Sequence, residues 1–183
     1  NKLEVVEEKH MNNLIIYGSQ YGTTKRYAEK FAEMMDFPVI SYENIKSLTE
    51  YDRVIYFGGL YAGGVKGLKS TVKKLSPNTK LVIVTVGLAD VCDEENIVNI
   101  RNSIAKQVPE HLLKMSSVFH LRGGIDYQKL SFKHKTMMTL LYNRAKKLPE
   151  DRKTAEDRAM IETFNSKVDF VDYNSLNNVA RNI

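Results

Sequence analysis

Short runs of consecutive apolar residues alternate along this chain with longer segments in which apolar residues recur every three or four positions. The three clearest runs, residues 14–17, 53–57 and 81–86, are rich in β-branched or aromatic side chains, and each is followed by a glycine. Runs of this length and composition predict strands that are buried on both faces of a sheet. Two weaker runs, at residues 37–40 and 116–121, bring the predicted strands to five.

Helical periodicity fills the segments between these runs. Residues 24–35 give the strongest pattern, because Tyr27, Ala28, Phe31 and Ala32 share one helix face and charged residues occupy the other. Weaker helical patterns cover four further ranges, namely 43–48, 65–75, 94–107 and 173–183. Strands that alternate with helices require right-handed crossovers, and these produce a parallel sheet covered on both faces. We therefore predict a doubly wound α/β fold.

The segment between the fifth predicted strand and the last helix is too long for a loop in a domain of this size. Residues 130–148 carry an apolar stripe of their own at helical spacing, and Pro149 ends it. The next residues, 150–158, are charged with mixed sign, and we expect them to be solvated. The pattern predicts an insertion at about residues 126–165 within a single domain that spans residues 11–183.

The chain has 183 residues and a formal net charge of +5, and the basic residues are unevenly placed. Within residues 126–148 Asp126 is the only acidic residue, against six basic ones: Lys129, Lys133, Lys135, Arg144, Lys146 and Lys147. A local basic patch on an otherwise balanced domain predicts a localised anionic partner. No nucleic-acid-binding signature accompanies the patch, so we do not expect nucleic acid as a partner.

The cysteine count bears on the setting of the protein. Cys92 is the only cysteine, so no internal disulfide can form, and no Cys/His cluster has zinc spacing. We expect Cys92 to be a small packed residue without a redox role. No run approaches the roughly 18 apolar residues that cross a bilayer. We expect a reducing, cytoplasmic setting, with Met11 as the natural start and residues 1–10 as an extension.

The turn between the first predicted strand and the first helix carries the strongest chemical pattern. It consists of Ser19, Gln20, Tyr21, Gly22, Thr23 and Thr24. Backbone N–H groups and hydroxyls of such a turn can converge on one small anion, and the N-terminus of the following helix adds partial positive charge. This favours a phosphate monoester, since neither a Walker loop nor a dinucleotide-binding glycine motif is present. The alternative is an ordinary turn in which Ser19 or Thr23 caps the helix.

Two further loops are expected at the same edge of the sheet, because ligands of open α/β sheets bind beyond the carboxyl ends of the strands. The loop after the third strand is glycine-rich and contributes Leu60, Tyr61, Ala62, Gly63 and Gly64. The loop after the fourth strand contributes Gly87, Leu88, Ala89 and Asp90. Close backbone approach at glycines and the flat face of a tyrosine favour a mononucleotide site for a flat ring.

Residues 15–24, which read IIYGSQYGTT, followed by Ala28, resemble the phosphate signature of the flavodoxin family, although Phe31 stands where that family often has an aliphatic residue. The resemblance extends in element order to residue 183. It implies a five-stranded parallel sheet in the order 2-1-3-4-5 and FMN as the cofactor.

The same resemblance implies roles for the three loops. The turn 19–24 would hold the FMN phosphate, and the loops around Tyr61 and Leu88 would hold the ring. Gly63 or Gly64 would offer a backbone group to flavin N5. We assign these residues binding roles and no catalytic side chain, since no Ser-His-Asp arrangement or pair of carboxylates is recognisable.

A narrower resemblance concerns the second half of the chain. Residues 123–127, the basic stretch and residues 168–173 resemble the menaquinone-dependent protoporphyrinogen oxidase branch of flavodoxin-like proteins. That branch implies oxidation of a porphyrinogen with a quinone as acceptor. Two alternatives stay open, namely a one-electron carrier for redox protein partners and a binding module that has lost the flavin.

The basic insertion allows two interpretations. Lysines and arginine around a Met/Leu stripe can hold a hydrophobic anionic small molecule, a quinone, or the anionic inner face of a membrane in peripheral contact with residues 126–148. In the other interpretation the stripe packs on the domain and the lysines form its solvated rim.

Overall fold

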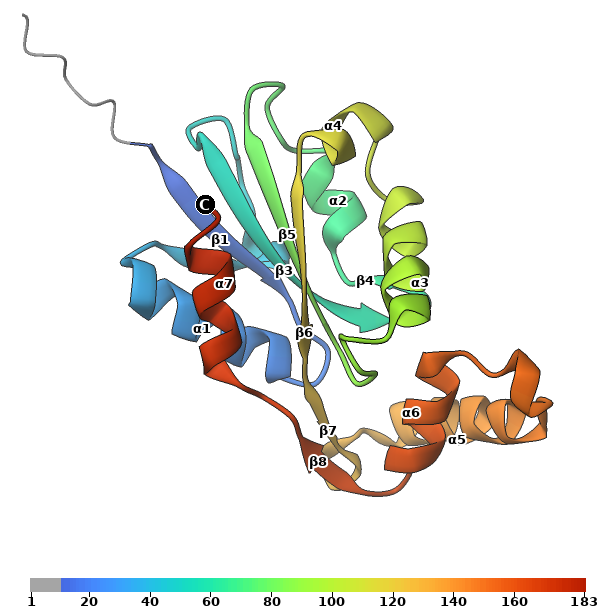
Figure 1. Ribbon diagram of the computed structural model, residues 1–183. Coiled ribbons are helices and arrows are strands. Elements are labelled where there is room, and N and C mark those ends of the chain that lie inside the picture. The colour runs from blue at the N-terminus through green and yellow to red at the C-terminus, as the bar shows by residue number, and fades with distance from the viewer. Residues whose placement is uncertain (1–10) are drawn as a thin grey trace, which may run out of the picture.

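The computed structural model describes residues 11–183 and contains a parallel sheet of five main strands (Figure 1). Their spatial order is β2 (Val39–Ser41), β1 (Asn13–Gly18), β3 (Arg53–Tyr61), β5 (Lys80–Gly87) and β6 (Ser117–Arg122). Because β4 is a short antiparallel addition to β3, this is the predicted order 2-1-3-4-5, and the predicted α/β class is confirmed. The predicted extension at residues 1–10 lies outside the described residues.

Helices cover both faces of the sheet (Figure 1). One face is covered by α1 (Thr23–Met35) and α7 (Leu176–Ala180), and the other by α2 (Leu68–Val72), α3 (Glu94–Ala105) and α4 (Glu110–Lys114). Successive strand residues point to opposite faces. Ile15 and Phe57 therefore pack with α1, whereas Ile16 and Tyr56 pack with α2 and α3.

The region after the third strand differs from the prediction. β3 continues to Tyr61 and pairs with β4 (Gly64–Val65), so the glycine-rich loop expected after the third strand is a tight hairpin that turns at Ala62 and Gly63. The predicted helix 65–75 shortens to α2 because β4 takes its first residue and Gly67, with φ of 76°, precedes the helix. The glycines permit this hairpin, and the pairing of β3 with β4 determines that it forms.

Two further predicted helices, at residues 43–48 and 173–183, are also shorter than expected. The range 43–48 contains a single 3₁₀ turn, η1 (Tyr42–Asn44). The final segment begins with another such turn, η4 (Tyr173–Ser175), before α7. Each segment has a buried leucine, Leu48 or Leu176, that packs into the domain. Packing, and not the length of the helix, therefore determines where each segment lies.

The insertion is a small subdomain beside the carboxyl ends of the strands (Figure 1). An antiparallel pair, β7 (Gly124–Asp126) and β8 (Lys167–Asp169), forms its base. Between them lie η2 (Tyr127–Lys129), α5 (Phe132–Lys147), η3 (Glu150–Arg152) and α6 (Ala155–Thr163). The predicted helix within the insertion is confirmed as α5.

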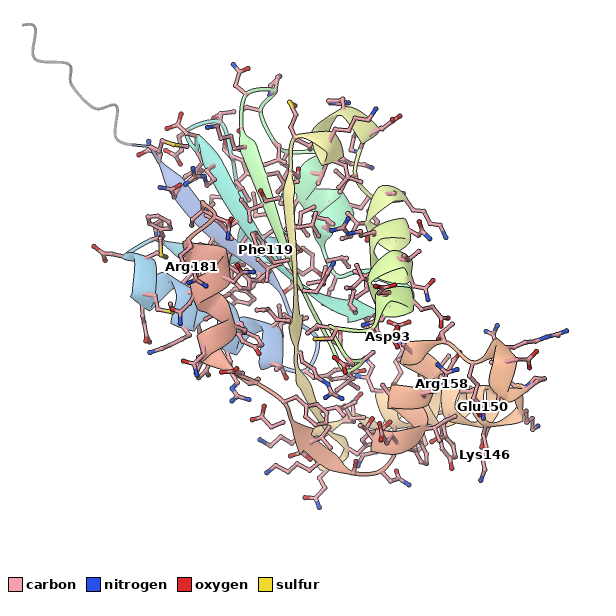
Figure 2. All side chains as sticks on the ribbon, in the orientation of Figure 1. Asp93, Phe119, Lys146, Glu150, Arg158 and Arg181 are labelled. Atoms are coloured by element: carbon pink, nitrogen blue, oxygen red, sulfur yellow. The ribbon has the colours of Figure 1, made fainter. Side chains whose placement is uncertain are left out.

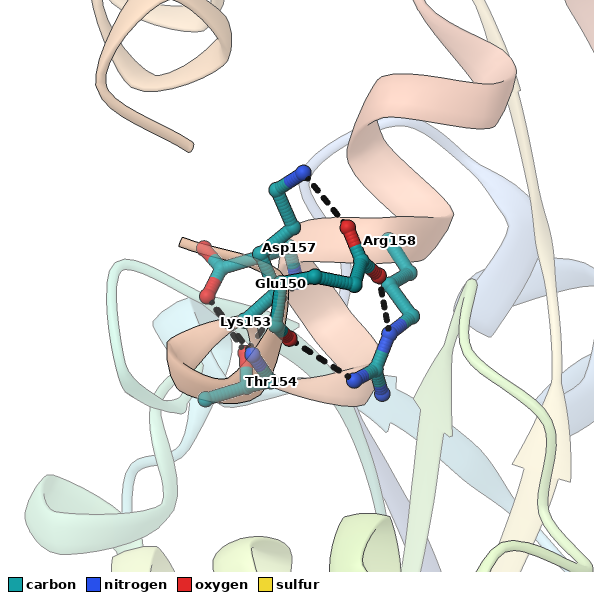
Figure 3. Close-up of polar contacts among 5 residues, drawn as sticks. All are labelled: Glu150, Lys153, Thr154, Asp157 and Arg158. Atoms are coloured by element: carbon teal, nitrogen blue, oxygen red, sulfur yellow. Dashed lines mark hydrogen bonds and ion pairs between the residues drawn. The ribbon is translucent and has the colours of Figure 1, made fainter. Parts of the chain in front are cut away.

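Residues 150–158 are largely exposed, as expected of a charged segment, and they are also ordered. Thr154 and Asp157 form a capping box that starts α6, and Ala155 is buried. Glu150 accepts hydrogen bonds from Lys153 Nζ at 2.8 Å and Arg158 Nε at 3.2 Å (Figure 3). These contacts order the α5–α6 junction even though its charged groups face solvent.

The insertion shares a core with the parent domain. Its buried centre is formed by Ile125, Tyr127, Leu130 and Met138, and Tyr21 and Leu88 from the two predicted ligand loops pack against that centre. The apolar stripe of α5 therefore packs inward, as the second interpretation expected. Two large side chains on α5 do not, since Phe132 is 87% and Leu140 is 66% exposed.

Candidate functional site

A cavity of about 550 Å³ lies where the strands end and the insertion begins. Eleven of the fifteen site residues predicted from sequence line it: Gln20, Tyr21, Thr23, Thr24, Leu60, Tyr61, Ala62, Gly63, Gly87, Leu88 and Ala89. The three loops thus meet at one place, as the topology of a parallel sheet predicts. The volume lies within the range of small-molecule sites.

The other four predicted residues, Ser19, Gly22, Gly64 and Asp90, do not line the cavity. Ser19 Oγ accepts a 3.0 Å hydrogen bond from Gly22 N, which closes the turn. Gly64 belongs to β4. Asp90 accepts from Cys92 N at 2.9 Å and so shapes the approach to α3. These residues support the loops without facing the cavity.

The N-terminus of α1 is open toward an anion. Gly22 is its N-cap, with φ of 93° and no side-chain cap, whereas Asp93, Ser131 and Thr154 cap α3, α5 and α6 with their side chains. The alternative in which Ser19 or Thr23 caps α1 is therefore wrong, because Thr23 Oγ1 donates to Gly124 O instead. Uncapped N–H groups at a helix start favour a negatively charged ligand.

Two glycines keep the floor of the cavity free of side chains. A Cβ at Gly59 would lie 2.9 Å from Thr24 Oγ1, and a Cβ at Gly123 would lie 2.8 Å from a methyl group of Val86. Neither distance can be accommodated without movement. The floor is therefore backbone, which allows a flat ligand to approach closely.

The turn of the β3–β4 hairpin lies beside this floor and is held by a residue of α3. Ala62 and Gly63 both have left-handed backbone conformations, with φ of 50° and 77°. This pairing is typical of the two-residue turns that suit the twist of antiparallel strands. Ser103 from α3 donates a 2.7 Å hydrogen bond to Gly63 O. The turn is thus held in one orientation at the edge of the cavity.

Two tyrosines from different loops form an aromatic edge. The rings of Tyr21 and Tyr61 meet edge-on, with centroids 6.4 Å apart. Burial, followed by the proximity of Tyr61 and Tyr127, raises the pKa of Tyr21 to about 12. Its hydroxyl is buried and has no hydrogen-bond partner within residues 11–183. Tyr61 donates to Met137 Sδ at 3.8 Å and thereby contacts the insertion.

The insertion supplies the opposite wall of the cavity, which the sequence analysis did not predict. The lining residues from α5 and α6 are Met137, Met138, Leu141, Arg144, Glu156, Asp157, Ala159 and Met160. This wall is mostly apolar, and Arg144 is the only cation among the residues that line the cavity. Burial, together with the neighbouring Asp157, raises the pKa of Glu156. Asp157 itself accepts from Thr154 N, so it serves the helix cap.

One supporting contact was also not foreseen. Arg122, at the end of β6, donates from Nε to Leu88 O at 2.9 Å, and its guanidinium lies 3.8 Å from the ring centre of Phe170. The contact joins positions 34 residues apart, so no local pattern could indicate it. Arg122 thus fixes the Leu88 loop against the sheet.

Cys92 and His120 do not line the cavity. Cys92 is exposed, so the expectation that it is packed is wrong. His120 lies on the edge strand β6, hydrogen-bonds Thr85 Oγ1 through Nδ1 at 2.7 Å, and has its pKa lowered to about 4 by burial and then by Arg101. Among residues 11–183 no cluster of potential metal ligands occurs, and no helix there is long and apolar enough to span a membrane.

A family model described as a flavodoxin domain matches residues 14–152 of this chain. A flavoprotein from Lactobacillus acidophilus NCFM in complex with FMN is 14% identical, with a TM-score of 0.42 over 61% of this chain and 92% of that chain. A flavodoxin variant from Pseudomonas aeruginosa is 15% identical, with a TM-score of 0.40 over 73% of this chain and 96% of that chain. No curated protein matches the sequence.

Proposed function

Because this chain belongs to the flavodoxin domain family, we propose that it is an oxidoreductase that binds FMN in the cavity at the carboxyl ends of its strands. The proposal depends above all on the open N-terminus of α1 at that cavity, which suits a phosphate group. When bound, FMN supplies a centre that takes up and returns electrons, and the protein supplies placement and electrostatics.

Several features of the chain fit this cofactor. Thr23, Thr24 and Gln20 line the cavity at the turn, while the backbone floor leaves room for a flat ring. The hydroxyl of Tyr21 keeps its proton, because its pKa is raised, and it is buried within the protein. Tyr21 lines the cavity and can therefore meet a ligand with its ring.

Of the two glycines considered for contact with the ring, Gly63 is the better candidate. Gly63 lines the cavity, whereas the Cβ position of Gly64 points to the Gln107 amide at 3.4 Å. Tyr61 and Leu88 lie on the cavity walls, where they can flank the ring. Each of these residues would bind or orient the cofactor.

The finer part of the proposal concerns the substrate. The wall is mostly apolar and carries Arg144 together with the acidic Glu156 and Asp157, so it suits a hydrophobic molecule whose acidic group lies at Arg144, of which a protoporphyrinogen is an example. The substrate would lose electrons and protons, and a quinone would take up both to form the quinol. The side chains of Met137, Met138 and Met160 adapt to irregular apolar shapes, which supports an oily substrate.

The test begins with the absorption spectrum of the purified protein after incubation with FMN. A flavin spectrum that survives gel filtration supports the cofactor, and its absence favours the alternative of a binding module without flavin. The FMN-loaded protein is then mixed with a porphyrinogen and a quinone. Turnover supports the substrate proposal, whereas bound FMN without turnover rejects it and leaves the cofactor proposal intact.

The alternative of a one-electron carrier for a redox protein predicts a different reductive titration. A carrier takes up its two electrons in separate, well-resolved steps and does not oxidise small molecules. An oxidase of the proposed kind passes to the two-electron form with little of the one-electron form. The insertion wall favours the oxidase, because it closes one side of the cavity that a protein partner would approach.

We also propose peripheral contact with an anionic lipid surface through residues 126–148. Phe132 and Leu140 are exposed among the lysines of α5, and Lys146 points away from the parent domain (Figure 2). Basic residues near an anionic leaflet each contribute about 1 kcal/mol at low salt. Sedimentation with anionic vesicles at two salt concentrations tests this. Absence of binding at both concentrations rejects it.

A further inference from the structure

His134 joins the first turn of α5 to the turn at residues 19–24, which is called the phosphate turn here because it is proposed to hold the FMN phosphate. Its Nε2 lies 3.1 Å from Gln20 Nε2, and its Nδ1 lies 2.9 Å from Ser131 Oγ. The imidazole ring also meets the rings of Tyr21 and Tyr61 edge-on, at centroid distances of 5.7 Å and 6.2 Å. A residue of the insertion therefore contacts two of the three loops that form the cavity.

The partners of Gln20 determine where the proton on His134 lies. Lys66 Nζ donates to Gln20 Oε1, and an ammonium group can only donate. The amide of Gln20 must therefore direct its NH₂ group at His134 Nε2, which makes that nitrogen an acceptor. The proton of the neutral ring consequently lies on Nδ1, from which it is donated to Ser131 Oγ.

A second proton on His134 has no place in this arrangement. It would sit on Nε2 and face the NH₂ group of Gln20, and a rotated amide would direct that same NH₂ group at the Lys66 ammonium. The other titratable groups around the ring are the phenols of Tyr21 and Tyr61, with Lys133 and Lys135 beside it on α5. No carboxylate within residues 11–183 hydrogen-bonds or ion-pairs with His134. Protonation therefore breaks the contact with Gln20.

We propose that His134 is a positioning residue that, when neutral with its proton on Nδ1, holds Gln20 and the tyrosine pair in the geometry that binds the cofactor. The inference rests on the proposed function, since the positioned groups line the FMN cavity. It assigns a purpose to the insertion beyond forming a wall, because α5 then acts on the phosphate turn. Protonation of His134 releases the start of α5 from that turn and weakens FMN binding.

Three variants test this role. His134→Gln keeps an acceptor near the position of Nε2 and cannot titrate in the neutral range. His134→Lys offers donors alone and imitates the protonated ring. Lys135→Gln, at the exposed neighbouring position, is the matched control for the loss of a basic residue on α5.

The first measurement is the FMN dissociation constant as a function of pH between about 5.5 and 8. The wild type and Lys135→Gln should bind about fivefold or more weakly at the acid end, the loss that one hydrogen bond represents. His134→Gln should hold the high-pH affinity throughout, and His134→Lys should be weak throughout. If all four proteins share one pH profile, the proposal is wrong.

The second measurement needs no FMN and so separates this proposal from the proposed function. Nitrogen NMR shifts of His134 in the apoprotein should report a proton on Nδ1 at neutral pH. Amide exchange in the first turn of α5 should accelerate on acidification in the wild type, and not in His134→Gln. A proton on Nε2, or acceleration equal in both proteins, overturns the proposal. If FMN binds neither the wild type nor any of the variants, the proposed function falls. The NMR shifts and the amide exchange still decide the role of His134.

Discussion

Arg122 Nε donates a 2.9 Å hydrogen bond to Leu88 O, and the guanidinium of Arg122 rests on the ring of Phe170. Leu88 in turn packs into the core of the insertion, and Phe170 N bonds to Gly123 O just after β8. A single side chain therefore connects a cavity loop, the end of β6 and the returning strand of the insertion. The cavity is shaped by these long-range contacts as much as by its own loops.

Arg122→Met should loosen the Leu88 loop, because it keeps an apolar stem and removes the donor. Loss of a hydrogen bond of this kind corresponds to about 1–2 kcal/mol in the free energy of unfolding and about a tenfold rise in the FMN dissociation constant. Chemical denaturation and a fluorescence titration measure the two effects. Arg122→Lys keeps the charge but not the geometry of the Nε donor, so it should restore little of the stability and of the FMN affinity. Full recovery by lysine would show that charge alone matters.

His120 should make the stability of the protein depend on pH. Its pKa is lowered from 6.5 to about 4 in the fold, so between these values the unfolded chain binds a proton that the folded protein does not. The free energy of unfolding should be fully retained above about pH 6.5 and fall by about 2–3 kcal/mol as the pH approaches 4. His120→Gln should flatten this dependence in denaturation curves. His111→Gln, at an exposed position, should not, and an equal effect of both would contradict the assignment.

Gly59→Ala should damage the cavity floor. The added methyl group would lie 2.9 Å from Thr24 Oγ1 and 3.4 Å from Gly18 O, so the start of α1 must shift. Overpacking of this kind costs about 1–3 kcal/mol in stability and should weaken FMN binding with it. Gly64→Ala is the control, since its methyl group would lie 3.4 Å from the amide end of Gln107, an ordinary van der Waals contact. Equal loss of FMN affinity in both variants would contradict this description of the floor.

Arg144→Met tests the proposed substrate. Removal of the only cation that lines the cavity should raise KM for an acidic hydrophobic substrate by about tenfold, the value of one charge-assisted hydrogen bond. Lys146→Met, on the exposed side of the same helix, should behave like the wild type. Steady-state kinetics with the acidic substrate and with its neutral ester separate the loss of anion recognition from a general change in the cavity. If the ester and the acid respond alike to Arg144→Met, Arg144 does not recognise the anionic group.

The strands and the position of the turn 19–24 beside the cavity could be predicted because their determinants are local. The apolar run of β5 and the face of Tyr27, Ala28 and Phe31 on α1 can be recognised without knowledge of the rest of the chain. The capping box of Thr154 and Asp157 was equally visible as a pattern, and it would have indicated α6.

The remaining features depend on residues far apart in the chain. β7 and β8 are three-residue strands that pair across the whole insertion, and neither has a pattern of its own. The contact of His134 with Gln20 spans 114 positions, so His134 could not be distinguished from an ordinary surface histidine. The direction of the α5 stripe is likewise set by Tyr21 and Leu88, to which it packs.

The central claim is that the turn from Ser19 to Thr24 grips a phosphate group at the N-terminus of α1. The most direct test compares the dissociation constants of the apoprotein for FMN and for riboflavin, which differ only in that group. Charge-assisted hydrogen bonds to a phosphate predict that FMN binds at least about tenfold to a hundredfold tighter. Equal affinity for the two flavins, or no affinity for either, would contradict the account.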